Sequence, residues 1–161
     1  MDTTNEVASA QEVPNVESDK LLILIADDSR LLRKKLHEEL NRHDCEVLEA
    51  VNGKEAITFV LERGDIDGVI LDIVMPIVGG IEALEFIREV APNLPVVMLS
   101  SMNTPQKLMK CLKMGAIDFI QKPYTREQIA RTIDRLRKLK VKRQAKATEA
   151  AANEFDDFDE L

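Results

Sequence analysis

The stretch LLILIADDS, residues 21–29, indicates the fold class. Its first six residues form a continuous apolar run that is too short for a core helix and rich in branched side chains. This pattern is typical of a β-strand that is buried on both faces, and such strands occur mainly in parallel sheets. Two aspartates and a serine follow at once, so the buried strand ends on polar groups. The stretch therefore predicts a parallel sheet covered by helices.

The same alternation of strand and helix continues along the chain. Between the apolar runs, hydrophobic residues recur every third or fourth position, as in amphipathic helices. One such stripe consists of Leu32, Leu36 and Leu40, a second of Ile81, Leu84, Ile87 and Val90, and a third of Ile129, Ile133 and Leu136. The expected strands are residues 21–26, 45–50, 68–72, 95–100 and 118–121. Because strands separated by helices cannot pair as hairpins, we predict a three-layer, doubly wound α/β sandwich with a parallel sheet.

The composition divides the 161-residue chain into one domain and two tails. Residues 1–19 lack apolar periodicity and are expected to be a disordered leader. Residues 20–140 are long enough for one ordinary domain of roughly 100–150 residues. Residues 141–161 change from basic to acidic and end in NEFDDFDEL, so we expect a flexible tail there. The tail could solubilise the chain, dock residues 154–161 on a partner, or fold back on the basic helix end.

The charge and hydropathy of the chain argue against several partners. The net charge of −7 disfavours nucleic acid, which proteins hold mainly with Lys and Arg. The basic helix end, which includes Arg131 and Arg135, is more simply a solvated face than a nucleic-acid patch. No apolar run approaches the roughly 20 residues of a membrane span, and the first residues do not resemble a secretory signal. We therefore expect a cytoplasmic protein, with Cys45 and Cys111 as free thiols.

Polar side chains follow four of the five expected strands where each strand ends. They are Asp27 and Asp28 after the first strand, Asp72 at the end of the third, Ser100 at the end of the fourth and Lys122 after the fifth. In open parallel sheets, ligands bind at the carboxyl ends of the strands, so these groups are expected to converge. Three carboxylates this close would repel one another unless a cation joined them, and hard oxygen ligands suit Mg²⁺. The sequence predicts a magnesium site at this edge.

A phosphoryl-transfer chemistry fits these groups. With a metal bound, the Asp72 carboxylate can attack a phosphoryl group, while the Lys122 ammonium neutralises charge on the transferring oxygens and the Ser100 hydroxyl binds the product. Taken alone, each residue has an ordinary structural explanation, and Asp28 in particular could simply cap a helix. The joint placement at successive strand ends favours the phosphoryl site.

Four segments of the chain resemble the receiver domain of two-component response regulators, over about residues 20–139. They are LIADDS (24–29), LDIVMPIVGG (71–80), VMLSS (97–101) and GAIDFIQKP (115–123). The resemblance implies a flavodoxin-like (βα)5 fold with strand order 2-1-3-4-5. It also implies that Asp27, Asp28, Asp72 and the Val74 backbone carbonyl hold Mg²⁺. Asp72 would then accept a phosphoryl group from a histidine kinase or a phosphotransfer protein.

The resemblance also implies a switch. Ser100 occupies the position of the family's switch hydroxyl, Phe119 that of its switch aromatic, and Lys122 that of a lysine followed by a cis proline. The alternative for Phe119 is an ordinary core residue, since Phe is often buried. In the family, movement of these two side chains remodels the face of the fourth helix, fifth strand and fifth helix. A downstream protein would bind this face.

The chain resembles stand-alone chemotaxis-type regulators, although GAIDFIQKP and VMLSS also resemble receivers attached to chemotaxis methylesterases. No output segment is expected after the fifth helix, so we predict no enzyme activity beyond the chain's own phosphorylation and dephosphorylation. Two other classes stay open. One is a phosphatase-type enzyme on a related fold, whose acceptor aspartate usually follows the first strand. The other is a receiver-like scaffold that binds without being phosphorylated.

Overall fold

The computed structural model describes residues 20–101 and 104–159, with side chains up to Glu154. The expected leader, residues 1–19, lies outside the described residues. The strands are β1 (Leu21–Ala26), β2 (Cys45–Ala50), β3 (Gly68–Asp72), β4 (Val96–Ser100) and β5 (Asp118–Gln121). The helices are α1 (Arg30–Arg42), α2 (Gly53–Glu62), α3 (Gly80–Val90), α4 (Pro105–Lys113) and α5 (Arg126–Asp159).

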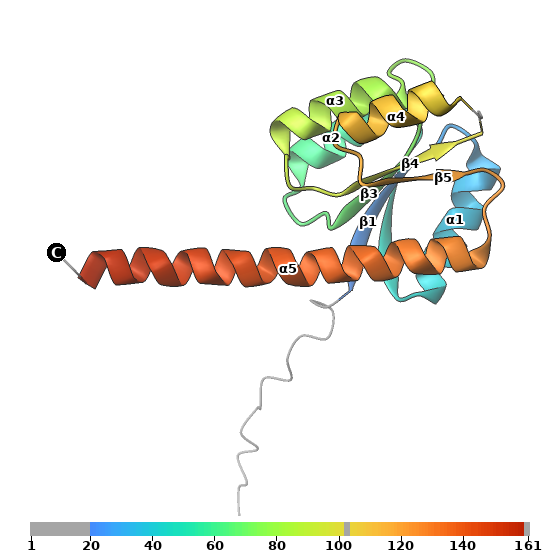
Figure 1. Ribbon diagram of the computed structural model, residues 1–161. Helices are drawn as coiled ribbons and strands as arrows, with labels where there is room; N and C mark the ends of the chain where they lie inside the picture. Colours follow the sequence, from blue (N-terminus) through green and yellow to red (C-terminus); the bar gives the residue numbers. More distant parts are fainter. Residues whose placement is uncertain (1–19, 102–103, 160–161) are drawn as a thin grey trace, which may run out of the picture.

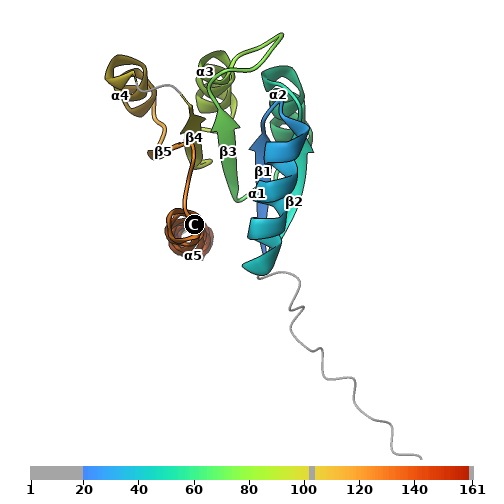
Figure 2. The same cartoon turned by 90° about the vertical axis from the view of Figure 1, so that its right-hand side faces the viewer.

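The strands pair in parallel in the order β2-β1-β3-β4-β5, which confirms the predicted fold class. Helices cover both faces of this sheet, as Figures 1 and 2 show. Apolar side chains of α2, α3 and α4 pack on one face, and those of α1 and α5 pack on the other. Because all five strands are parallel, their carboxyl ends lie at the same edge of the sheet.

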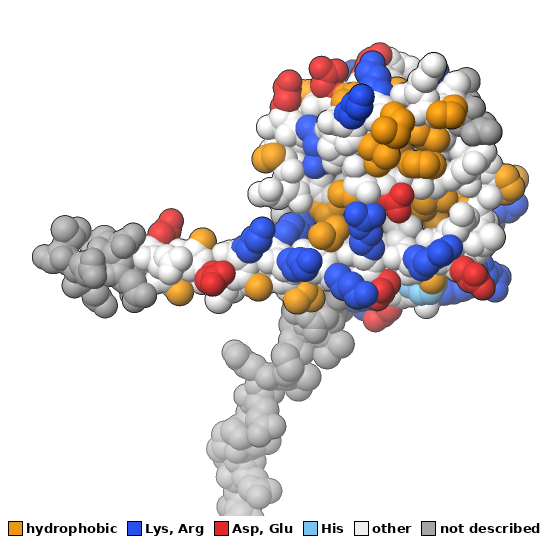
Figure 3. Space-filling view, viewed as in Figure 1, with side chains coloured by type: hydrophobic (Ala, Val, Ile, Leu, Met, Phe, Trp, Pro, Cys, Tyr) orange, Lys and Arg blue, Asp and Glu red, His pale blue; other side chains and the backbone are white. Residues whose placement is uncertain are grey.

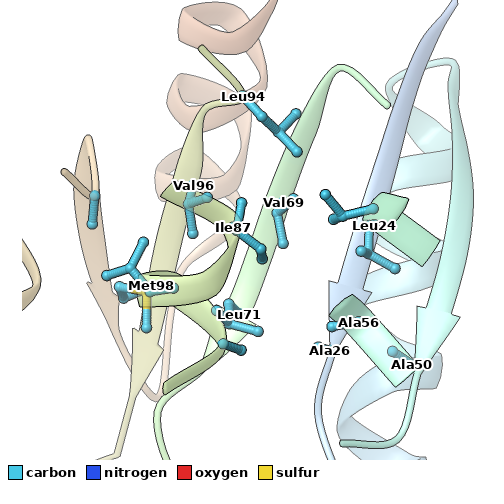
Figure 4. Close-up of a cluster of buried hydrophobic side chains, with 14 of the residues drawn as sticks. Leu24, Ala26, Ala50, Ala56, Val69, Leu71, Ile87, Leu94, Val96 and Met98 are labelled. Atoms are coloured by element: carbon cyan, nitrogen blue, oxygen red, sulfur yellow. The ribbon is translucent and has the colours of Figure 1, made fainter. Parts of the chain in front are cut away.

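The two faces of the sheet carry separate hydrophobic clusters, because side chains alternate along each strand. In β1, Leu22 and Leu24 join the cluster under α2 and α3, part of which Figure 4 shows, while Ile23 and Ile25 join the cluster under α1 and α5. Leu84 and Ile87 of α3 are fully buried, as predicted. Val90 was expected on the same stripe but is 44% exposed, because it is the last residue of α3 and lies at the rim of the core.

Helix α5 extends well beyond the core that it covers. The Thr125 hydroxyl accepts a hydrogen bond from the Gln128 backbone N–H, and the Thr125 backbone N–H donates to the Gln128 side-chain oxygen, so these two residues cap the start of α5. The helix then continues to Asp159 in place of the flexible tail expected over 141–161. Residues 144–159 contain five Ala and no Gly or Pro, which favours a helix.

Figure 1 shows the last turns of α5 projecting away from the domain. Residues 144–154 are exposed along their whole length. Among the described residues, no helix combines the length and the apolar character that crossing a bilayer requires.

A buried ion cluster fixes α5 to the amino end of the sheet. Asp67 is 8% exposed, just before β3, and its Oδ2 accepts from the Leu22 backbone N–H at 2.8 Å and from Lys140 Nζ at 3.1 Å. Arg143 donates to the Asp67 backbone carbonyl at 3.1 Å. This cluster, absent from the sequence predictions, holds the middle of α5 against the domain.

Candidate functional site

The carboxyl end of the sheet brings the predicted polar groups together. Asp27 lies directly after β1, Asp72 is the last residue of β3, and both are buried. Lys122 follows β5, and its Nζ donates to Asp27 Oδ2 at 2.8 Å and to Asp72 Oδ2 at 2.9 Å. One ammonium therefore bridges two carboxylates that are 45 residues apart in the sequence. The strand-end rule that predicted this convergence is confirmed.

Three carboxylates are grouped closely enough to share a cation. Oxygen atoms of Asp27, Asp28 and Asp72 lie within 4.8 Å of one another. The Asp28 side chain is exposed and does not cap α1, because the Ser29 hydroxyl accepts the hydrogen bond from the Leu32 N–H. Hard oxygen donors that leave room for several waters are the ligand set that Mg²⁺ prefers. The residues present therefore fit a magnesium ion.

Burial and charge oppose one another at this site. Burial raises the pKa of Asp72, and although Lys122 lowers it through a hydrogen bond and its charge, the net shift is upward. Burial alone would lower the pKa of Lys122, but its hydrogen bonds to Asp27 and Asp72 and their charges outweigh burial and raise it. Lys122 is thus held as a cation, while burial makes the charged form of Asp72 costly. A divalent cation would relieve that cost.

The loop after β3 is shaped around the Asp72 backbone. The Gly80 N–H donates to the Ile73 carbonyl at 2.9 Å, and a Cβ on Gly80 would lie 2.0 Å from the Asp72 carbonyl oxygen. Only glycine allows this approach. The Val74 backbone N–H donates to Asp72 Oδ1 at 3.3 Å, while the Val74 side chain is exposed. The start of α3 and the Asp72 side chain are therefore positioned by the same short loop.

Ser100 and Phe119 lie in different environments. Ser100 ends β4 and is 3% exposed, and its carbonyl accepts from the Lys122 N–H at 2.8 Å. Phe119 on β5 is 37% exposed, so it is not an ordinary core residue. It lines a hollow of about 270 Å³ between β5 and α5, together with Arg131 and Arg135. The peptide bond between Lys122 and Pro123 is cis, as expected.

One positioning residue was missed by the sequence reasoning. Arg33 on α1 donates through its terminal NH₂ group to the Asp27 backbone carbonyl at 2.8 Å, and its Nε lies 3.3 Å from Glu49 Oε1 on β2. Arg33 thereby ties the Asp27 backbone to the neighbouring strand. In the sequence it is one of several basic residues on a charged helix face, and no spacing distinguishes it from Lys34 or Lys35.

The fold and this site define a class: a doubly wound α/β domain with an acidic, cation-type site at the carboxyl end of a parallel sheet. Within that class, the family model of the response regulator receiver domain matches residues 23–134. The chain belongs to this family of two-component signalling domains.

Proteins similar in sequence include a chemotaxis protein and a methylesterase. Chemotaxis protein CheY of Thermotoga maritima is 33% identical over 117 residues, a match that covers 72% of this chain and 97% of that protein. A protein-glutamate methylesterase/protein-glutamine glutaminase of Caldanaerobacter subterraneus is 40% identical over 109 residues, covering 65% of this chain. The match spans only 29% of that protein's length.

The fold is also similar to solved structures of receiver domains. The CheX-CheY-BeF3-Mg+2 complex from Borrelia burgdorferi contains a chain with 33% sequence identity and a TM-score of 0.67, a match that covers 70% of this chain and 86% of that one. The BeF3-activated DrrB receiver domain is 25% identical with a TM-score of 0.65, covering 73% of this chain and 97% of that one.

Proposed function

We propose that the chain is a phosphorylation-controlled switch in which Asp72 is the phosphoryl acceptor. The observation that carries this proposal is the contact of Lys122 Nζ with Asp72 Oδ2, at 2.9 Å, beside two further carboxylates. The nucleophilic carboxylate of Asp72 therefore lies beside a fixed cation and a set of oxygen atoms that can bind a metal ion.

The oxygens of Asp27, Asp28 and Asp72 and the Val74 backbone carbonyl are the proposed ligands of Mg²⁺. When bound, the ion would neutralise negative charge on the transferring phosphoryl group. An Asp72 carboxylate oxygen attacks phosphorus, and the bond from phosphorus to the donor nitrogen or oxygen breaks with its electron pair leaving on the donor. Lys122 stays protonated and hydrogen-bonds a phosphoryl oxygen. We propose that the donor is a histidine kinase or a phosphotransfer protein.

We propose that Ser100 and Phe119 transmit the phosphorylation of Asp72 to the surface of the domain. The Ser100 hydroxyl lies at the strand end beside Asp72, where it can donate to a phosphoryl oxygen once one is present. Phe119 on the edge strand β5 is 37% exposed, so its ring is not fixed in the core and could change position. The phosphoryl group would favour one of two arrangements already present, shifting their populations rather than building a new fold.

We further propose that a downstream protein reads the face formed by α4, β5 and α5. The similarity to CheY supports a stand-alone, chemotaxis-type role in the cytoplasm, and the named complex of CheX with CheY is a precedent for a protein partner. The chain's own chemistry would be limited to gaining and losing its phosphoryl group.

Incubation with acetyl phosphate tests the proposal. We expect one phosphoryl group per chain by intact mass spectrometry, dependent on Mg²⁺ and absent from Asp72→Asn. A phosphatase-type enzyme would instead release many equivalents of phosphate without staying modified. A receiver-like scaffold would show no modification at all, and either result would contradict the proposal.

A further inference from the structure

The outer surface of α4 is both basic and apolar. Lys107, Lys110 and Lys113 are all exposed on this helix, which contains no acidic residue. Met109 is 53% exposed among them. A hollow of about 560 Å³ runs along this side and is lined by Pro105, Gln106, Met109, Lys110, Lys113 and Met114. Figure 3 shows hydrophobic side chains gathered beside Lys and Arg side chains on the upper part of the domain.

Such a surface fits an acidic amphipathic helix. Lysines around a hollow attract carboxylates, and methionine side chains are flexible enough to pack against varied apolar groups. An occupant should therefore combine several acids with a few large apolar side chains at helical spacing.

The chain itself contains a segment of this chemistry. Residues 154–161, EFDDFDEL, hold five carboxylates and no Lys or Arg, and so account for most of the net charge of −7. Phe155, Phe158 and Leu161 recur every third residue, which is the spacing of one helix face. The backbone of α5 is helical as far as Asp159.

The segment cannot reach α4 of its own chain. Helix α5 is continuous, and its last anchor to the domain is Arg143 beside Asp67. From there to Asp159 the helix advances about 24 Å at 1.5 Å per residue. Figures 1 and 2 show it leaving the domain in the layer opposite to α4. The same straight path keeps the acidic end away from the basic part of α5, so folding back in this helical state is not possible.

The projecting part of α5 lacks tertiary packing. Residues 144–154 are exposed along their whole length, whereas most helical stability in proteins comes from packing of one helix face. A contact at its end would stabilise it.

We propose that the acidic end of α5, residues 154–161, binds the basic and methionine-lined surface of α4 on a second copy of the chain. The contact would cover part of the face assigned above to the downstream partner, but it requires no phosphorylation step. A failure of this contact would therefore leave the proposed function intact, and a failure of the proposed function would leave this contact intact.

Charge reversal in the full chain tests this contact. Sedimentation equilibrium of the unmodified chain should show self-association that weakens with added salt. The triple variant Lys107→Glu, Lys110→Glu, Lys113→Glu should weaken it by about tenfold or more. The variant Asp156→Lys, Asp157→Lys, Asp159→Lys should weaken it similarly. Both sets combined in one chain should restore association, because the two charged surfaces are again complementary.

Two controls separate a specific contact from general charge repulsion. The variant Lys34→Glu, Lys35→Glu, Lys54→Glu makes the same change in net charge at exposed lysines of α1 and α2, and should leave association nearly unchanged. Phe155→Ser with Phe158→Ser leaves the charge intact and should weaken association. A monomeric full chain, a failure of the combined reversal to restore association, an equal effect of the control lysines, or no effect of the Phe changes would each overturn the proposal.

Discussion

The two ends of the sheet each hold a buried cluster of aspartate and lysine, but with opposite charge balance. At the amino end, one carboxylate, Asp67, meets two cations, Lys140 and Arg143. At the carboxyl end, three carboxylates are grouped together, and two of them, those of Asp27 and Asp72, contact a single ammonium, that of Lys122. Residue types and contact distances are similar at both ends.

The difference shows how a structural ion cluster can be told from a site. At Asp67 the negative charge is fully compensated, and the Leu22 N–H adds a hydrogen bond, so no further ligand is needed. At Asp72, burial raises the pKa of the carboxyl, and the neighbouring Asp27 carboxylate adds to this shift. An excess of buried carboxylate is stable only with an added cation, which is what a magnesium-dependent phosphoryl site requires.

Backbone packing should give the largest contrast between the ends. Gly80→Ala places a Cβ 2.0 Å from the Asp72 carbonyl oxygen. The backbone at Asp72 cannot move away without a large cost in free energy. We expect a loss of about 3 kcal/mol in the free energy of unfolding, measured by urea titration. At the amino end, Gly68→Ala meets only flexible atoms of Leu136 at 3.0 Å and should cost about 1 kcal/mol or less. Equal losses would show that the loop after β3 is not tightly constrained.

The two lysines should differ in function. Lys122→Met removes the cation beside Asp72 and should slow phosphorylation by acetyl phosphate about 100-fold, as is typical for loss of one group that stabilises transition-state charge. Lys140→Met, its matched control, should leave that rate unchanged. Intact mass spectrometry over time measures both rates. If Lys140→Met slowed the reaction as much, the two clusters could not be functionally distinct.

The amino-end cluster should contribute to stability alone. Asp67→Ala leaves Lys140 and Arg143 without their shared carboxylate and the Leu22 N–H without its acceptor. We expect a loss of about 2 kcal/mol in the free energy of unfolding, with the phosphorylation rate unchanged when measured well below the melting temperature. An unchanged stability would mean that the cluster does not anchor α5.

The pH dependence of stability at the carboxyl end, which arises at Asp72, should give the smallest effect. The raised pKa of Asp72 means that its neutral form favours the fold; this contribution is complete below the ordinary pKa of 3.8 and is lost as pH rises through the raised pKa. Without Mg²⁺ at neutral pH, Asp72→Asn should therefore be slightly more stable than the unmodified chain in thermal unfolding. The gain should vanish at acid pH, whereas Asp67→Asn should lose stability at neutral pH.

Much of this molecule was predictable because the rules involved are local. Apolar runs predicted β1, β3 and β4, and the alternation of strand and helix predicted the more polar β2 and β5. The strand-end rule then placed Asp27, Asp72 and Lys122 together. Asp67 was missed because it precedes a strand, where that rule does not apply, and Lys140 lies 73 residues away with no characteristic spacing. The extent of α5 was missed because acidic and basic composition suggested a tail, while the high helix propensity of its alanines was undervalued.

A crystal structure of the chain with Mg²⁺ and beryllofluoride tests the central claim most directly. We predict an ion ligated by oxygens of Asp27, Asp28 and Asp72, and a beryllofluoride group on Asp72 with Lys122 Nζ on one of its fluorines. Binding of the ion elsewhere, or an unmodified Asp72 still paired only with Lys122, would contradict the account.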